Sequence, residues 1–389
     1  MARQVAEENA IPNTWRTRKP GSIFWAPIGL SILLLRAVAY AIYLVPRSLR
    51  PTEHWTYRQA LATRLLKAIF GLIAVMGITF PLSLEARELG DRWVVIEPGP
   101  PAVYRSPLSS SVVQPGRIGA TWYPSRLQKD TSKGEEGLVA LCFHSGSFLW
   151  MTGRPDDCGS TARRLTSRLG PGARSLWVQY RLAGSDDPAP YPGPFQDALT
   201  AYLYLVQELH ISPSRIVLAG DSSGATLAIG LVRYLASHAQ ETGLDPSVMP
   251  RACLMFSPSV DYSVEGDSQQ IDNHRNQKCD YIDGRMAAWG ARAIAPPPIR
   301  LDDPYLSPAL SPFPTSVPIF AQAGGAEVLC DTIRSFSEAM RAVPGNKVRY
   351  MEVPGAPHDI YMVGEILGWS GETEQVFNAA ESFVSEVQI

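Results

Sequence analysis

The feature that most constrains this chain is the segment Gly-Asp-Ser-Ser-Gly at residues 220–224. It stands between a short apolar run at 215–219, typical of a β-strand, and a stretch with helical spacing at 223–237. In such a tight strand-to-helix turn there is almost no room for a side chain two positions before and two positions after the central residue. This accounts for Gly220 and Gly224. The context predicts a nucleophile elbow, with Ser222 as the exposed nucleophile.

From about Asp91 onward, short apolar runs alternate with amphipathic segments and are separated by glycine and proline. This texture predicts an α/β domain with a mainly parallel central sheet flanked by helices. A further helix is expected at 195–210, and the polar stretch 265–277 with the proline-rich stretch 295–304 is expected to form an insertion over the sheet. The expected strands are residues 138–143, 175–180, 215–219, 252–257, 318–323 and 348–353.

The N-terminal part has a different character. A polar tail at 1–20 precedes an apolar segment, Gly21 to Val45, that only Arg36 interrupts. The segment is long enough for a hydrocarbon core of ~30 Å, yet a central arginine costs roughly 2.5–3.5 kcal/mol on insertion scales. A membrane anchor and an interfacial helix therefore both remain open, and the protein is expected at a membrane such as the endoplasmic reticulum, or in the cytoplasm.

A second apolar run at 68–84 is slightly short for a membrane span and predicts a buried helix that caps the catalytic domain. The predicted organisation is therefore a polar tail (1–20), an apolar helical extension and cap (21–90), and a catalytic domain (91–389).

Charge and cysteine content exclude several classes of protein. Lysine and arginine total 35 against 37 acidic residues, a net charge of -2, so no broad basic surface for nucleic acid is expected. The five cysteines never form a Cys-x-x-Cys pair and indicate neither a metal site nor a disulfide framework. They favour a reducing compartment, and no metal or organic cofactor is implied.

Residues 144–147, His-Ser-Gly-Ser, follow the expected strand 138–143 and lie about eighty residues before the elbow. The segment is similar to an HGGG oxyanion loop, in which a flexible backbone turns its N–H groups toward a developing oxyanion. The expected donors are Gly146, Ser147 and Ser223, while His144 is expected to be structural. An ordinary turn after a strand is the alternative.

The chain order serine, acid, histidine of such elbows requires a base after a late strand. His358 follows the expected strand 348–353 and is the histidine that meets this requirement. Two carboxylates compete as the acid in the loop after strand 318–323, namely Glu327 and Asp331. Asp331 directly precedes a helical stretch at 332–341 and has a structural role available as its N-cap, whereas Glu327 has none.

Together these motifs resemble the hormone-sensitive-lipase-like branch of the α/β-hydrolases, over roughly residues 91–389. Further matching segments lie at 180–183 (Tyr-Arg-Leu-Ala), 257–261 (Ser-Pro-Ser-Val-Asp) and 305–308 (Tyr-Leu-Ser-Pro). In that branch the acid motif reads Asp-Pro-Leu-x-Asp, so the resemblance puts Glu327 on the catalytic position and Asp331 on the second acidic one. The chain departs from the branch in having Ser145 and Ser147 in the oxyanion loop, Ala225 after the elbow and glutamate as the acid. The apolar N-terminus resembles fungal members.

The resemblance and the motifs imply an α/β-hydrolase fold and a serine hydrolase that cleaves a carboxylic ester through an acyl-enzyme on Ser222. His358 would act as general base and then acid, while Glu327 fixes the imidazole tautomer. A small-molecule ester is the expected substrate class, and a natural-product ester is the member of it that the resemblance suggests. The same residues could serve acyl transfer, condensation or cyclisation in secondary metabolism. A ligand-binding module, as in plant gibberellin receptors, is a remote alternative because those receptors lack the histidine.

Overall fold

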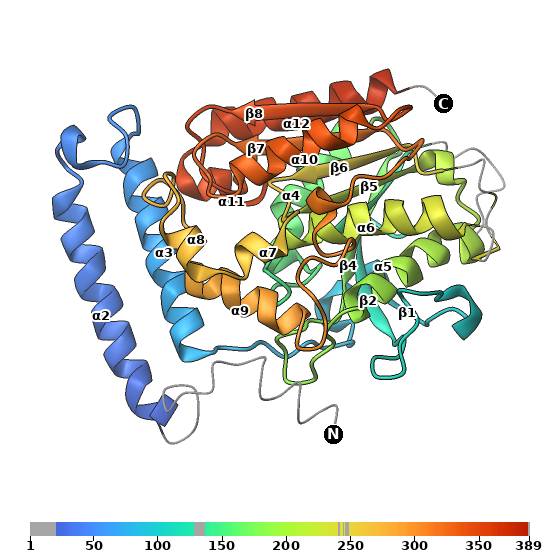
Figure 1. The fold of residues 1–389 in the computed structure, drawn as a ribbon, viewed down its shortest axis with the longest axis horizontal. Helices are drawn as coiled ribbons and strands as arrows, with labels where there is room; N and C mark the ends of the chain where they lie inside the picture. The colour runs from blue at the N-terminus through green and yellow to red at the C-terminus, as the bar shows by residue number, and fades with distance from the viewer. Residues whose placement is uncertain (1–20, 128–136, 240–241, 244, 246–248, 388–389) are drawn as a thin grey trace.

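A computed structural model describes residues 21–127, 137–239, 242–243, 245 and 249–387 of the chain. Its centre is a sheet with the strand order β1-β2-β4-β3-β5-β6-β7-β8 (Figure 1). The pairs β1–β2 and β2–β4 are antiparallel and all other pairs are parallel. The strands are β1 (Trp93–Ile96), β2 (Ile118–Tyr123), β3 (Val139–Phe143), β4 (Arg174–Gln179), β5 (Ile216–Asp221), β6 (Ala252–Phe256), β7 (Ile319–Gly324) and β8 (Val348–Val353).

Helices cover both faces of this sheet, as an α/β-hydrolase fold requires, so the predicted fold class is confirmed. Alternate side chains of the strands point into two separate hydrophobic cores, one shared with α5, α6 and α10 and the other with α4, α11 and α12. The helices are α2 (Gly21–Tyr43), α3 (Tyr57–Met76), α4 (Pro155–Arg168), α5 (Gly193–Leu203), α6 (Ser223–His238), α7 (Tyr262–Glu265), α8 (Ser268–Asp272), α9 (Gly284–Ile294), α10 (Cys330–Ala342), α11 (Ile360–Leu367) and α12 (Ser370–Glu386).

The six expected strands correspond to β3 through β8, with boundaries within about two residues. The helix expected at 195–210 is α5 with a π-helical continuation, Tyr204–Glu208, and the one expected at 223–237 is α6. Strands β1 and β2 were not predicted. Strand β1 has four residues, and β2 contains Gly119, on which the Trp93 ring lies so closely that a Cβ would approach it to 2.1 Å. Glycine and alanine weaken the strand signal, and this packing exists only in the folded sheet.

The two N-terminal helices lie side by side at one end of the molecule (Figure 1). Helix α3 starts with a capping box between Thr56 and Gln59 and ends at Met76, because Gly77 adopts a left-handed conformation. The prediction of a helix over 68–84 is therefore wrong at both ends. The helix starts eleven residues earlier, and residues 78–86 form a non-helical connection to the sheet.

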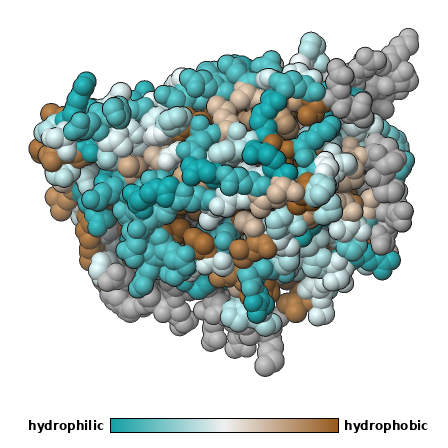
Figure 2. All heavy atoms as spheres, turned by 45° about the horizontal axis from the view of Figure 1, so that its top comes forward, coloured by the Kyte–Doolittle hydropathy of each residue, from teal (hydrophilic) through white to brown (hydrophobic). Residues whose placement is uncertain are grey.

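Helices α2 and α3 are both long and apolar enough to cross a membrane, judged by length and composition alone, which is weak evidence. They differ in burial, since 6% of the apolar window of α2 is buried and 39% of that of α3. Hydrophobic side chains gather at the left-hand edge in Figure 2, the end that α2 occupies in Figure 1. Helix α3 also packs against α9 and α11 and so reaches the catalytic part of the fold.

The segment between β6 and β7 forms the expected insertion. It contains α7, α8 and α9, which lie between α3 and the sheet in Figure 1. Helix α9 packs closely on the loop after β3, since a Cβ on Gly290 would lie 2.8 Å from the backbone oxygen of Ser147. The insertion therefore covers the carboxyl ends of the parallel strands, the edge where ligands bind in open α/β sheets.

Candidate active site

Ser222 lies in the turn between β5 and α6, with φ 49° and ψ −121°. This conformation is costly for a residue with a side chain, and the surrounding backbone enforces it. The N–H of Ser222 donates to the carbonyl of Phe256 at 2.9 Å. A Cβ on Gly220 would lie 2.4 Å from the Gly224 carbonyl oxygen, and one on Gly224 would lie 2.1 Å from that of Phe143. The turn therefore needs glycine at both positions and points the Ser222 side chain away from the sheet.

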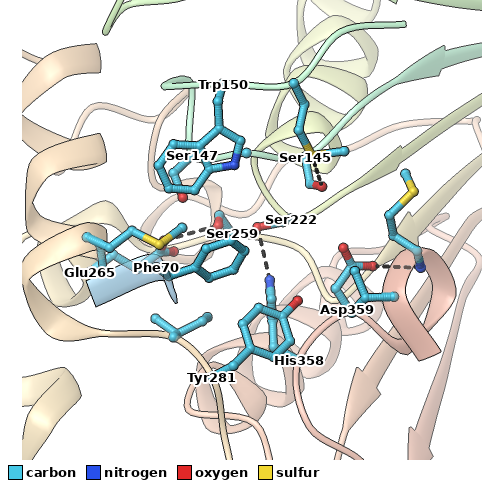
Figure 3. A pocket seen from close by; sticks show the side chains of 17 residues that line it. Phe70, Ser145, Ser147, Trp150, Ser222, Ser259, Glu265, Tyr281, His358 and Asp359 are labelled. Carbon is cyan, nitrogen blue, oxygen red and sulfur yellow. Dashed lines mark hydrogen bonds between the residues drawn. The ribbon is translucent and has the colours of Figure 1, made fainter. Parts of the chain in front are cut away.

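Three predicted residues from distant parts of the chain come together above the sheet. The Nε2 atom of His358 lies 3.1 Å from Ser222 Oγ, and its Nδ1 lies 2.9 Å from Glu327 Oε2 (Figure 3 shows the first contact). All three side chains are buried. The arrangement is that of a serine, a base and a carboxylate that orients the base.

Asp331 stays outside this group. Its carboxylate accepts hydrogen bonds from Arg275 Nη2 at 2.7 Å and pairs with His274 Nε2 at 3.2 Å. The Arg275 hydrogen bond holds the pKa of Asp331 well below its usual range. The prediction that Asp331 is an N-cap is wrong, because α10 begins one residue earlier at Cys330, with Leu329 in the cap position. Asp331 lies in the first turn, where its charge suits the helix dipole.

Two residues of the insertion fix the loops that carry the acid and the base. Asp280 Oδ1 accepts from the N–H of His358 at 3.2 Å, and its Oδ2 accepts from the N–H of Val328 at 2.7 Å. Asn276 Nδ2 donates to the carbonyl of Glu327 at 2.9 Å. Neither residue was predicted as functional, because neither stands in a motif with a local sequence signal. They act as positioning residues.

The electrostatics favour a base that can take up a proton. Burial of His358 opposes the imidazolium, but the hydrogen bond and charge of Glu327 outweigh this effect and raise the pKa of His358 above its ordinary value. Burial raises the pKa of Glu327, while its hydrogen bond to His358 acts in the opposite direction. An imidazolium formed when Ser222 loses its proton would therefore be stabilised by a carboxylate in contact with it.

The loop after β3 brings Gly146 and Ser147 beside Ser222, in the wall of one cavity. Both have positive φ, 107° and 53°, and Gly146 has no room for a Cβ, which would lie 2.3 Å from the Trp150 carbonyl oxygen. Within the described residues, the backbone N–H groups of Gly146, Ser147 and Ser223 donate to no carbonyl. No backbone carbonyl among the described residues therefore competes for these N–H groups, and their role as oxyanion donors stays a prediction.

His144 lies behind this loop and is fully buried. Its ring stacks on Tyr180 at 4.2 Å, and its Nδ1 lies 2.7 Å from the carbonyl of Ser145. Burial lowers the pKa of His144 to about 4, so the ring is neutral near neutral pH. It supports the oxyanion loop by packing, and the structural role expected for it agrees with this environment.

The cavity beside Ser222 is small, about 70 Å³ in volume, and mostly apolar. Phe70 of α3, Trp150, Tyr281 and Met286 form much of its wall, together with Glu265 and Ser259 as polar members (Figure 3). Among the described residues, no three or more histidine, cysteine, aspartate or glutamate side chains form a cluster that could hold a metal ion.

The fold and this site geometry define the class of the α/β hydrolases. A family model described as alpha/beta hydrolase fold matches residues 140–362, and the chain belongs to this family. An acetyl-hydrolase of Streptomyces hygroscopicus is 31% identical over 250 residues, covering 64% of this chain and 74% of that protein. An esterase of Acinetobacter venetianus is 24% identical over 258 residues, covering 66% and 78%.

Among solved structures, an esterase from the bacterial hormone-sensitive lipase family is similar, with a TM-score of 0.56 and 20% identity. The similarity covers 91% of this chain and 98% of that one. At this identity the structural similarity by itself shows the fold alone. Taken together with the family match, it supports the prediction of the hormone-sensitive-lipase-like branch. The resemblance to fungal members stays a prediction.

Proposed function

We propose that this carboxylic ester hydrolase works through an acyl-enzyme on Ser222, with His358 as proton shuttle and Glu327 as its orienting acid. The observation that supports this most is the continuous chain of contacts from Ser222 Oγ through both ring nitrogens of His358 to Glu327 Oε2, at 3.1 and 2.9 Å. The acetyl-hydrolase and esterase names of its relatives support ester hydrolysis as the reaction.

In this mechanism His358 Nε2 takes the proton of Ser222 as Oγ attacks the ester carbonyl. The N–H groups of Gly146, Ser147 and Ser223 bind the resulting oxyanion, and each such donor is worth roughly 3–4 kcal/mol in comparable sites. The imidazolium then gives its proton to the leaving alcohol, which departs and leaves the acyl group on Ser222. Water repeats the sequence, with His358 as base, and releases the acid.

The size of the cavity favours substrates with a short acyl group. About 70 Å³ accommodates few heavy atoms, and a long chain would need the walls formed by Phe70 and Met286 to move. The names acetyl-hydrolase and ethyl acetate hydrolase among the relatives agree with a short acyl group. A natural-product ester is compatible with such a cavity when the larger part of the substrate is the alcohol.

The test combines a fluorophosphonate probe, read by intact mass, with p-nitrophenyl esters of short and long acyl chains. One covalent adduct on Ser222 and faster turnover of short esters are expected. Absence of an adduct would contradict the acyl-enzyme. A different outcome would favour acyl transfer or condensation. In that case the probe labels Ser222 and the acyl-enzyme forms, but the acyl group passes to an added alcohol or amine and not to water.

We also propose that α2 contacts a membrane, as an anchor or as an interfacial helix. The support is its apolar surface, on which Leu35 and Ile42 are 71% and 69% exposed. Exposed apolar area of this extent favours a nonaqueous partner, because burial gains about 25 cal/mol per Å². Fractionation of the full chain with and without detergent tests the proposal, and a soluble full-length protein would contradict it.

A further inference from the structure

Glu265 is a buried carboxyl group that the proposed mechanism does not use. It is the last residue of α7, and it forms part of the wall of the cavity that holds Ser222 and His358. Its Oε2 accepts a hydrogen bond from Ser259 Oγ at 3.0 Å, whereas its Oε1 has no partner in the part of the chain that the structure describes. One oxygen of a carboxyl group beside the reacting centre is thus left unsatisfied.

The carboxyl group lies close to the reacting atoms. Ser259 links the two, because its N–H donates to the carbonyl of Ser222 at 3.1 Å while its hydroxyl donates to Glu265. In Figure 3, Ser259 stands between Ser222 and Glu265. A substrate that occupies this cavity with its ester carbonyl at Ser222 can therefore present a neighbouring group to Glu265.

The surroundings favour the neutral form of this acid. Phe70, Ile282 and Met286 are apolar neighbours in the same wall, and burial raises the pKa of Glu265 to about 8. Near neutral pH the group is then a carboxylic acid, which both donates and accepts a hydrogen bond. Rotation about the Cγ–Cδ bond exchanges the two oxygens, so either one can serve Ser259 while the other, buried in the cavity wall, is left for a substrate group.

An unsatisfied buried polar group costs free energy, and a ligand that satisfies it recovers this cost. A purely hydrocarbon acyl or alcohol group would leave the acid unpaired. A hydroxyl group matches it, since it too donates and accepts. The rest of the wall is too apolar to favour an ion.

We propose that Glu265, supported by Ser259, determines specificity by hydrogen bonding to a hydroxyl group that the ester substrate carries near its scissile carbonyl. The inference rests on the proposed ester hydrolysis at Ser222 and adds a substrate class, the hydroxylated short esters. Glu265 is a binding residue in this account and takes no part in the bond-making steps.

The test compares matched esters that differ by one hydroxyl group. One pair is p-nitrophenyl butyrate and p-nitrophenyl 3-hydroxybutyrate, which places the hydroxyl on the acyl side. The other is ethyl acetate and 2-hydroxyethyl acetate, which places it on the alcohol side. The readout is the ratio of kcat/KM within each pair, so general losses of activity cancel.

For the wild type we expect the hydroxylated ester to be favoured in one of the two pairs by about five- to tenfold, as one net hydrogen bond allows. Glu265→Gln should keep most of this ratio, since the amide also donates and accepts. Glu265→Met should abolish it, and Ser259→Ala should reduce it. Met286→Leu, a volume-conserving change in the same wall, is the matched control and should leave the ratio unchanged.

A wild type that is labelled by the fluorophosphonate but shows no preference in either pair would overturn this inference alone. A preference that persists in Glu265→Met would do the same. The inference would also be overturned if Glu265→Met lowered kcat/KM equally for both esters of the preferred pair. That result would mean that Glu265 only supports the fold or the charge of His358. No labelling and no turnover in the wild type would overturn the proposed function itself, and the inference with it.

Discussion

The carboxyl edge of the sheet and the N-terminal helix α2 both place side chains in an environment that does not match their polarity. At the sheet edge, polar groups such as Glu327 and His358 are buried and bonded to one another. On α2, large apolar groups such as Leu34 and Leu35 are exposed. Both arrangements cost free energy in water, the first through desolvation and the second through exposed apolar area.

The difference lies in what offsets that cost. At the sheet edge the compensation is internal, because Asp280, Asn276 and the backbone of the elbow hold each polar group in place. On α2 the described part of the chain offers little cover. We therefore expect substitutions at the sheet edge to change the chemistry and substitutions on α2 to change where the protein resides.

The largest expected effect is that of Ser222→Ala. Turnover of p-nitrophenyl esters should fall by on the order of 10⁶, as for loss of the nucleophile in comparable enzymes. Fluorophosphonate labelling should vanish in intact-mass spectra, while circular dichroism and the melting temperature stay close to the wild type. Labelling at a different serine would move the nucleophile away from the elbow.

Glu327→Gln comes next. A neutral amide neither stabilises the imidazolium nor selects the correct tautomer, so kcat should fall by about 10⁴. Steady-state kinetics with a short p-nitrophenyl ester measure the loss, and the thermal unfolding midpoint checks that the fold is retained.

Asp331→Asn is the matched control, four residues further along the chain in the first turn of α10. Asp331 is 42% exposed as a side chain and pairs with Arg275 on the surface, so its loss should cost about 0–1 kcal/mol of stability and leave most activity. If the two variants behaved the other way round, Asp331 would be the acid and Ser222 and His358 would keep their roles.

The acidic limb of the pH profile should also respond to Glu327. Proton uptake requires neutral His358, so kcat/KM falls as the pH drops through the pKa of His358. Glu327 raises this pKa, and Glu327→Gln removes the cause, so the acidic limb of the residual activity should move to lower pH. An unmoved limb would mean that another group controls it.

The smallest expected effect on catalysis is that of changes in α2. Deletion of residues 1–46 should shift the protein from membrane to soluble fractions while esterase activity persists. Because the deletion also removes the buried Leu44, the double variant Leu35→Glu/Ile42→Glu provides a milder test on the exposed face. Ile366→Glu, on α11, is the matched control, since Ile366 is 70% exposed but lies outside α2. Equal release by this control would argue against a specific role of α2.

The elbow illustrates what the sequence by itself determined. Gly220 and Gly224 flank Ser222 between a strand pattern and a helix pattern, and this combination specifies a tight strand-to-helix turn. A Cβ at either glycine would meet backbone atoms at 2.1–2.4 Å. Six of the strands followed from short apolar runs, whereas β1 and β2 did not, because Gly119 depends on the packing of Trp93. Local sterics and periodicity are readable along the chain, but contacts across the sheet are not.

Glu327 and Asp331 could both serve as the acid in local terms, and only the tertiary structure separates them. It buries one against His358 and leaves the other on the surface with Arg275. The same holds for Asp280 and Glu265, which the sequence places in or next to a polar insertion and the fold turns into the site. Burial and partner choice depend on segments far apart in the sequence, and they decide the charge and role of a carboxyl group.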